Sequence, residues 1–89
     1  MVNKAQSKIT EGLKLVIEGE LYEVEEALEQ PESDWTRRFI EGKLESTNLN
    51  LTKALIKPPY FGDEELMELQ RRYHGLLIKV NQKLYATVE

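Results

Sequence analysis

Apolar residues with helical spacing fill three long stretches of this sequence, and this spacing limits the fold more than any other feature. In the first stretch they recur every three or four positions, as on one face of an α-helix, and do not alternate as in a strand. We therefore predict a long amphipathic helix from Val2 to Leu28. The residues of its apolar face are Ala5, Ile9, Leu13, Val16, Ile17, Leu21, Val24 and Leu28.

A proline-containing break, QPES, follows this helix at residues 30–33. Pro31 disfavours helical geometry at the residue before it, and Ser33 or Asp34 can cap the backbone amides of a new helix. The break therefore predicts a tight helical hairpin, with a second helix from Asp34 to Lys57. The seam that packs on its antiparallel neighbour consists of Ile40, Leu44, Thr47, Leu51 and Ala54.

A second break, in the stretch LTKALIKPPYFGDEE, separates the second helix from a third. Pro58 and Pro59 remove two backbone donors, so the second helix must stop before them. Gly62 allows the bend that follows, and Asp63 can cap the next helix. The third helix is predicted from Asp63 to Val88. Its main apolar face consists of Leu66, Leu69, Tyr73, Leu76, Leu77, Val80 and Leu84.

The third helix also carries a second apolar line, formed by Met67, His74, Ile78 and Tyr85. A helix of a small bundle needs only one apolar stripe to pack on its neighbours. Three interpretations are open for the second line: contact with the other helix of the same chain, contact between subunits, or one side of a ligand groove.

Together these elements predict an all-α fold: an antiparallel helical hairpin extended to three long helices in one domain, residues 1–89. At this length a chain buries only about 60% of the surface that its unfolded form exposes, so a lone copy is marginally stable. Disulfides and metals are common remedies, but the sequence has 0 Cys and 1 His. We therefore expect a homo-oligomeric helical bundle.

The net charge of −4 and the pI of about 5.1 leave no basic field of the kind that holds a phosphate backbone. A nucleic acid polymer is therefore not an expected partner. No apolar run approaches the roughly 20 residues of a membrane span, and the first residues lack the apolar centre of a signal peptide. We expect a cytoplasmic protein with no membrane partner.

Acidic residues are concentrated at the end of the first helix and in the turn after it. The negative end of a helix dipole disfavours carboxylates there. Antiparallel packing brings Arg37, Arg38 and Lys43 alongside, so intrachain ion pairs are one explanation. The others are pairing between subunits and a functional role: mimicry of nucleic-acid charge or docking of a basic partner, the latter as expected of a small acidic adaptor or inhibitor that binds a host protein. The acidic residues are Glu18, Glu20, Glu23, Glu25, Glu26, Glu29, Glu32 and Asp34.

Gly12, Gly19, Gly42 and Gly75 all lie inside predicted helices, although each costs about 1 kcal/mol there relative to alanine. Gly12 and Gly19 are seven residues apart and therefore share one face of the first helix. A close helix crossing is the favoured explanation for this pair. Space for a flat ligand and simple tolerance of glycine are the alternatives.

No group of residues in the sequence predicts catalysis. The single histidine, His74, has no second His or Cys with which to share a metal, and no serine has a His at the spacing of a catalytic triad. The sequence also lacks a P-loop and a GxGxxG pattern. We therefore expect a non-enzymatic protein with no cofactor and no metal site.

The segment SDWTRRFIEGKLESTNLNLTKALIKP, Ser33 to Pro58, resembles the helical-hairpin segment of the phage anti-CBASS and anti-Thoeris sponges, which sequester cyclic-nucleotide signals. The matching residues are Asp34, Trp35, Thr47, Leu49, Leu51, Lys53, Ala54 and Pro58. The resemblance implies a counter-defence protein that binds a cyclic dinucleotide such as cGAMP between the copies of a homo-oligomer, a hexamer as in that family. Such a protein acts in the host cell cytoplasm.

A sponge of this kind needs flat rings that stack on bases and cations that hold two phosphates. Two local clusters meet this description. They are Tyr60, Phe61, Lys53 and Lys57 near the second break, and Trp35, Arg37 and Arg38 at the start of the second helix. A hydrophobic plug that closes the end of the bundle is the alternative role for Tyr60 and Phe61.

Overall fold

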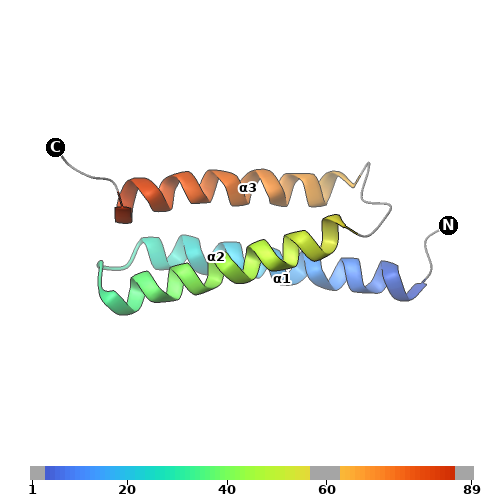
Figure 1. The fold of residues 1–89 in the computed structure, drawn as a ribbon, viewed down its shortest axis with the longest axis horizontal. Coiled ribbons are helices and arrows are strands. Elements are labelled where there is room, and N and C mark those ends of the chain that lie inside the picture. The colour runs from blue at the N-terminus through green and yellow to red at the C-terminus, as the bar shows by residue number, and fades with distance from the viewer. Residues whose placement is uncertain (1–3, 57–62, 86–89) are drawn as a thin grey trace.

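The computed structural model describes residues 4–56 and 63–85, and these form three α-helices and no strand (Figure 1). The helices are α1 (Lys4–Leu28), α2 (Asp34–Leu55) and α3 (Glu64–Val80), and a π-helical turn, η1 (Asn81–Tyr85), continues α3. The predicted all-α fold is therefore confirmed. The predicted helix ends at Val2, Lys57 and Val88 lie outside the described residues.

The turn between α1 and α2 forms where the sequence predicts it, and Ser33 is the residue that caps α2. The backbone of Ser33 is extended, and its hydroxyl accepts a 3.1 Å hydrogen bond from the Thr36 N–H. This bond satisfies one of the amides that have no partner at the start of a helix. Asp34, the other predicted cap, lies in the first turn of α2, where its charge suits the helix dipole.

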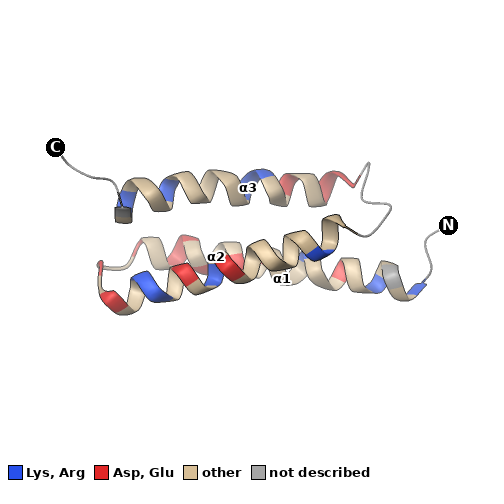
Figure 2. Ribbon diagram, in the orientation of Figure 1, with Lys and Arg blue, Asp and Glu red and all other residues tan. Residues whose placement is uncertain are grey.

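α3 begins directly after its predicted cap, Asp63. The carboxylate of Asp63 accepts a 3.1 Å hydrogen bond from the Leu66 N–H. Glu64 and Glu65 in the first turn suit the positive end of the α3 dipole, and Figure 2 shows this end of the helix in red. From there α3 returns along the hairpin, antiparallel to α2 (Figure 1).

One hydrophobic core joins the three helices. The seam residues predicted for α2 are all buried, which confirms that prediction. α3 is tied to α2 by Tyr73, whose buried hydroxyl donates a 3.4 Å hydrogen bond to the Leu44 carbonyl. The apolar residues of the core are Ile17, Leu21, Val24, Ala27, Ile40, Leu44, Leu51, Ala54, Leu66, Leu69, Tyr73, Leu76 and Val80.

The face of α1 that packs is narrower than the predicted apolar face. Ile9 and Val16 are each 50% exposed, whereas Ile17 is fully buried. Neighbouring residues of an α-helix lie about 100° apart around its axis, so Val16 cannot share the direction of Ile17. The first turns of α1 also extend past the end of α2 (Figure 1). Ala5, at the start of the same predicted face, is exposed too, so the predicted packing of Ala5, Ile9 and Val16 is wrong.

The second apolar line of α3 does not pack on the rest of the chain. Met67 is 40% exposed, Ile78 is 59% exposed, and His74 is also exposed. α3 contacts the hairpin through its main apolar face and through the ion pairs of Glu65 and Arg72, and these three residues belong to neither contact. The interpretation that they contact another helix of the same chain is therefore wrong. The side chain of Tyr85 lies outside what the structure describes.

Gly12 and Gly19 do not mark a close helix crossing within the described chain. A Cβ atom added at either position meets no heavy atom within 4 Å, apart from its local backbone, and the same holds at Gly42 and Gly75. All four glycines are exposed. The prediction of close packing at Gly12 and Gly19 is therefore wrong for a single chain.

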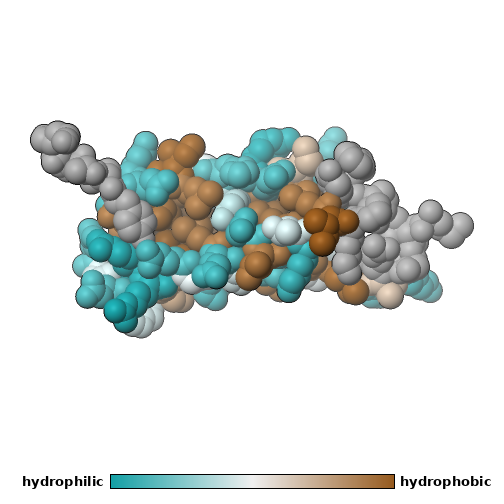
Figure 3. All heavy atoms as spheres, viewed as in Figure 1, coloured by the Kyte–Doolittle hydropathy of each residue, from teal (hydrophilic) through white to brown (hydrophobic). Residues whose placement is uncertain are grey.

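The assembled helices form an elongated body that measures 53 × 23 × 16 Å. In Figure 3 a band of apolar atoms is visible along the junction of α3 with the hairpin, between hydrophilic margins. Within the described ranges, no helix has the length and apolar character needed to cross a membrane.

Candidate functional site

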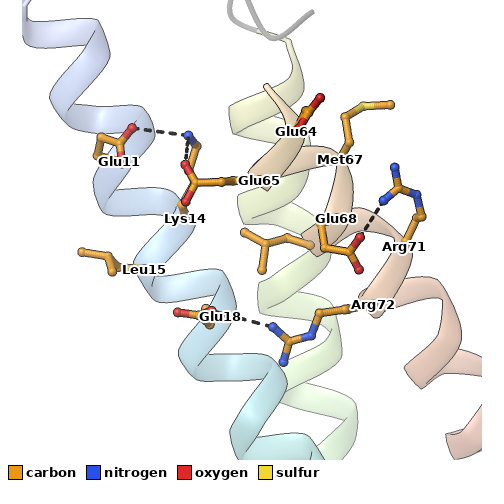
Figure 4. A pocket seen from close by; sticks show the side chains of 11 residues that line it. Glu11, Lys14, Leu15, Glu18, Glu64, Glu65, Met67, Glu68, Arg71 and Arg72 are labelled. Carbon is orange, nitrogen blue, oxygen red and sulfur yellow. Dashed lines mark hydrogen bonds and ion pairs between the residues drawn. The ribbon is translucent and has the colours of Figure 1, made fainter. Parts of the chain in front are cut away.

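A groove of about 850 Å³ runs between α1 and α3 (Figure 4). It combines two exposed apolar side chains, Leu15 at 71% and Met67 at 40% exposure, with many charged ones. Five glutamates and three cations line it, so the lining has an excess of two negative charges. The lining residues are Glu11, Lys14, Leu15, Glu18, Glu64, Glu65, Met67, Glu68, Leu69, Arg71 and Arg72.

Two helix faces position these side chains. On α1, Glu11, Leu15 and Glu18 are spaced by four and three residues and therefore project from one side of the helix. On α3, Glu65, Glu68 and Arg72 have the reverse spacing of three and four. In Figure 4, Glu65 and Arg72 of α3 reach across to Lys14 and Glu18 of α1. Glu68 turns toward Arg71, and Leu15 projects from the side of α1 away from α3.

Lys14 is the buried anchor at the end of the groove nearest the start of α3. Its side chain is only 10% exposed, and its Nζ lies 2.7 Å from Asp63 Oδ2, 3.3 Å from Glu11 Oε1 and 3.5 Å from Glu65 Oε1. Because Asp63 also caps α3, this ion pair fixes the first turn of α3 against α1.

The pKa of Lys14 is raised and the pKa of Asp63 is lowered, so both residues stay charged over a wider pH range than usual. Burial opposes the charge of Lys14, but hydrogen bonds and charge attraction from Asp63 and Glu11 outweigh it and raise the pKa of Lys14 above its ordinary value of 10.5. Burial likewise opposes ionisation of Asp63. The hydrogen bonds from Lys14 and from the Leu66 N–H nevertheless lower the pKa of Asp63 below 3.8.

The two arginines of the groove are also paired. Arg72 lies 3.8 Å from Glu18 and 3.8 Å from Glu25, and its guanidinium is 4.9 Å from the centre of the Tyr22 ring. Arg71 pairs with Glu68 at 2.7 Å within α3. Each cation of the groove therefore has a carboxylate partner, and the uncompensated charge of the lining is acidic.

The acidic stretch of α1 and its turn is partly neutralised within the chain, as one of the three explanations proposes. Lys43 of α2 pairs with Glu23 at 3.1 Å, and Arg37 pairs with Glu32. Arg72 of α3 adds the pairs described above, which sequence reasoning missed. Intrachain pairing is therefore confirmed for Lys43 and Arg37.

Glu20 is held in a different way, by uncharged donors. It is 7% exposed, and its carboxylate accepts hydrogen bonds from the side chains of Ser46, Thr47 and Asn50 on α2. The bonds from Thr47 and Asn50 are 3.3 and 3.1 Å long, and the Thr47 hydroxyl also lies 2.7 Å from the Lys43 carbonyl. This cluster fixes the register of α1 against α2.

Of the predicted ligand-binding residues at the start of α2, Trp35 forms an aromatic pair at the surface with Phe39, whereas Arg37 pairs with Glu32. Trp35 is 71% exposed and stacks on Phe39, with ring centres 5.3 Å apart and planes inclined by 17°. Lys43 Nζ lies 5.6 Å from the centre of the Phe39 ring. Arg38 is exposed nearby. Sequence reasoning missed Phe39, although its position four residues after Trp35 is a signal for a helical pair.

The remaining predicted ligand-binding residues do not join this cluster. Lys53 is exposed, but it lies 18 residues after Trp35 on the same helix, which corresponds to about 27 Å along the axis. Lys57, Tyr60 and Phe61 lie outside the described residues. Within one chain, the two predicted clusters are therefore not brought together by the part that the structure describes.

The described residues contain no group of three or more His, Cys, Asp or Glu side chains arranged to hold a metal ion. No family model, curated protein or solved structure matches this chain. The sponge resemblance and the predicted ligand contacts therefore stay predictions.

Proposed function

We propose that this chain is a non-enzymatic binding protein that holds a basic amphipathic segment of another protein in the groove between α1 and α3. This is the function of a small acidic adaptor or inhibitor. The observation that carries the proposal is one groove in which exposed apolar side chains, Leu15 and Met67, lie among glutamates in excess over cations. A segment with leucine-like side chains beside lysines or arginines is complementary to it.

The charges and the apolar residues of the groove have different roles in this proposal. Glu65 lies at the rim with 80% of its side chain exposed, and charges in such positions speed association and select partners more than they tighten binding. Met67 and the other apolar contacts supply more of the binding free energy, because desolvated apolar anchors dominate most interfaces. The groove cations are paired already, so they repel an incoming basic segment only weakly.

A helical peptide with leucines on one face and lysines around them is the probe for this proposal. Its binding is measured by fluorescence anisotropy at low and high salt. We expect Glu68→Lys and Met67→Ala each to weaken binding, the charge reversal by about tenfold at low salt and by less at high salt. Glu45→Lys changes the net charge equally but lies on exposed α2 surface outside the groove, and it is the matched control.

Two results contradict the groove proposal. One is equal binding by the Glu68→Lys and Glu45→Lys proteins, which would mean that only overall charge matters. The other is no binding of the peptide by the unaltered protein. Reversal of Glu23 and Glu25 is a poorer test, because these residues pair with Lys43 and Arg72 inside the chain.

A cyclic-nucleotide sponge is the second candidate function, and the stacked pair of Trp35 and Phe39 favours it. An exposed indole of this kind is a surface on which a nucleobase can stack. Arg38 and Lys43 lie on the same helix and are able to approach phosphates. As the resemblance implies, such a protein is a phage counter-defence factor that withholds a signal from a host effector.

Thermal melting with a panel of cyclic di- and trinucleotides tests the second candidate. A ligand present at 100 times its Kd stabilises the native state by about 2.7 kcal/mol, which raises the melting temperature of a domain of this size by roughly 10–20 °C. Trp35→Ala removes an exposed side chain, so the variant is expected to fold and to lose the shift. No shift with any member of the panel excludes a sponge for these nucleotides.

A further inference from the structure

We propose that the outward face of α1 is an interface between two copies of this chain, which pack antiparallel about a two-fold axis near the middle of the helix. The inference does not depend on the proposed function. The face, called the outer stripe here, is exposed along its whole length. It consists of Ala5, Lys8, Gly12, Leu15, Gly19, Tyr22, Glu26 and Glu29.

The outer stripe has features that the single chain does not explain. Gly12 and Gly19 each cost about 1 kcal/mol inside a helix relative to alanine, yet an added Cβ at either position meets nothing within 4 Å among the described residues beyond its local backbone. Leu15 and Tyr22 are 71% and 53% exposed beside them. Small residues therefore alternate with large apolar ones on a helix face that stays exposed in the single chain. Arg72 of α3 lies at its edge, 4.9 Å from the centre of the Tyr22 ring.

The spacing along the stripe is that of a helix–helix seam. Successive members are three and four residues apart from one end to the other, which is the a/d pattern of two helices packed side by side. In this pattern Gly12 and Gly19 occupy one position of the repeat, and Leu15 and Tyr22 occupy the other. Such a seam predicts a partner helix that inserts large side chains over the glycines.

Charge and size select a second copy of α1 in antiparallel orientation as that partner. Lys8 then lies opposite Glu26, Gly12 opposite Tyr22, and Leu15 opposite Gly19. Every layer therefore matches a small residue with a large one or a cation with a carboxylate. A two-fold axis repeats each contact, because the same patch is used on both copies.

The other arrangements of two such helices are less complementary. A parallel pair places Lys8 against Lys8 and Glu26 against Glu26, and it leaves Gly12 facing Gly12 with a gap. An antiparallel pair shifted by seven residues in one direction sets Glu26 against Leu15, so a charge meets an apolar side chain. The shift in the other direction sets Lys8 against Gly19 and loses the pairing of Lys8 with Glu26. Only the first arrangement satisfies both charge and shape.

The outer stripe borders the acidic groove, because Leu15 belongs to both. In the proposed dimer Leu15 packs on Gly19 of the second copy, so Met67 on α3 is the apolar side chain of the groove that the dimer leaves exposed. Glu68 lies on α3, away from the stripe. Reversal of Glu68 consequently separates the two proposals, since it is expected to weaken peptide binding and to leave the dimer unchanged.

The first test measures molar mass by sedimentation over a range of protein concentrations. We expect the unaltered chain to form a dimer that dissociates on dilution. Gly19→Leu places a large side chain where Leu15 of the second copy must fit, so this variant is expected to stay monomeric at every concentration. Gly42→Leu, at an equally open glycine on α2, is the matched control and is expected to form the dimer.

Both glycine variants are expected to fold, because each site has room for a side chain and leucine favours helix more than glycine does. Circular dichroism is expected to show that both remain folded. An unaltered chain that is monomeric at millimolar concentration overturns the proposal, and so does a dimer that survives Gly19→Leu, since the contact then lies on another face.

The second test exchanges the charges at the ends of the stripe. Lys8→Glu and Glu26→Lys each create two like-charge contacts in the dimer and are expected to raise its dissociation constant by on the order of tenfold at low salt. The double variant restores opposite charges and is expected to recover the original value. Single variants without effect, or a double variant as weak as the single ones, overturn the antiparallel register.

Discussion

α1 contacts α2 and α3 through different mixtures of neutral hydrogen bonds and ion pairs. Against α2, the Glu20 carboxylate is surrounded by uncharged donors and lies within a buried contact. Against α3, Lys14 and Arg72 form ion pairs with carboxylates. Hydrogen bonds from neutral groups respond little to salt, whereas ion pairs near the surface are screened. The hairpin also has such an ion pair, Lys43 with Glu23, beside the Glu20 cluster. Salt and pH are therefore expected to adjust the contact of α3, which forms the groove, more than the contact of α2.

Replacement of Glu20 is expected to give the largest change in stability. Glu20→Ala leaves the Ser46 and Asn50 donors without their partner and empties space between α1 and α2, at a cost of about 2–4 kcal/mol in the free energy of unfolding. The exposed Glu45→Ala is the matched control and is expected to change stability by less than about 0.5 kcal/mol. Urea unfolding measures both. Similar values for the two variants would show that the Glu20 cluster does not stabilise the hairpin.

The ion pair of Lys14 and Asp63 is expected to contribute less, because Asp63 keeps some contact with solvent. Lys14→Met leaves the Asp63 carboxylate unpaired in a partly buried site, at a cost of about 1–3 kcal/mol. Asp63→Asn removes the charge and retains an oxygen that can cap α3. A double-mutant cycle from urea unfolding is expected to show coupling between the two substitutions. Additive effects would mean that the pair is not energetically linked.

The elements of this fold follow from local sequence signals. Two helix caps are short polar residues near a helix breaker: Ser33 lies two residues after Pro31, and Asp63 directly follows Gly62. The seam of α2 has the three-and-four spacing of a buried face. These features depend on residues within one or two turns of each other. For that reason they were predictable without knowledge of how the helices pack.

The candidate site was harder to predict because it depends on how α3 is rotated against α1. Arg72 and Glu18 are 54 residues apart in the sequence, and nothing local to either predicts the pair. Lys14 did carry a signal, since it lies three residues before Ile17 on the buried side of α1. A lysine on an apolar face indicates a buried anion from another element. The exposure of Leu15 likewise depends on which side of α1 the third helix covers.

The dependence of stability on pH is expected to separate the two contacts further. The folded pKa of Asp63 is lowered, so its contribution is complete above pH 3.8 and is lost as the pH falls through the folded pKa. The folded pKa of Lys14 is raised, so its contribution is complete below pH 10.5 and is lost as the pH rises through the folded pKa. Urea unfolding of the unaltered and Asp63→Asn proteins across pH measures both effects.

Asp63→Asn is expected to reduce the fall in unfolding free energy at acid pH, because the titrating carboxyl is gone. It is expected to reduce the fall at alkaline pH as well, because Lys14 has lost its partner. Burial also raises the pKa of Tyr73 above 10.0. Since ionised Tyr73 is disfavoured in the fold, it adds to the alkaline loss, and Tyr73→Phe isolates that part. An Asp63→Asn protein with an unchanged pH profile at both ends would exclude the pair as the source of the dependence.

The smallest expected effect, and the one that most directly compares the two contacts, concerns Arg72. Arg72→Gln loses two ion-pair contacts at 3.8 Å and the contact with the Tyr22 ring, which together stabilise by about 1 kcal/mol at low salt. Arg71→Gln is the matched control, because among the described residues Arg71 forms an ion pair with Glu68 of its own helix and with no residue of α1 or α2. Urea unfolding measures the free energy of unfolding of both variants. The difference between the two values is expected to shrink in 1 M NaCl, where the Debye length is only about 3 Å.

The loss of stability caused by Glu20→Ala is expected to stay the same in 1 M NaCl, since the groups that donate to Glu20 carry no charge. A Glu20 effect that falls with salt as steeply as the Arg72 effect would mean that both contacts of α1 depend on long-range charge.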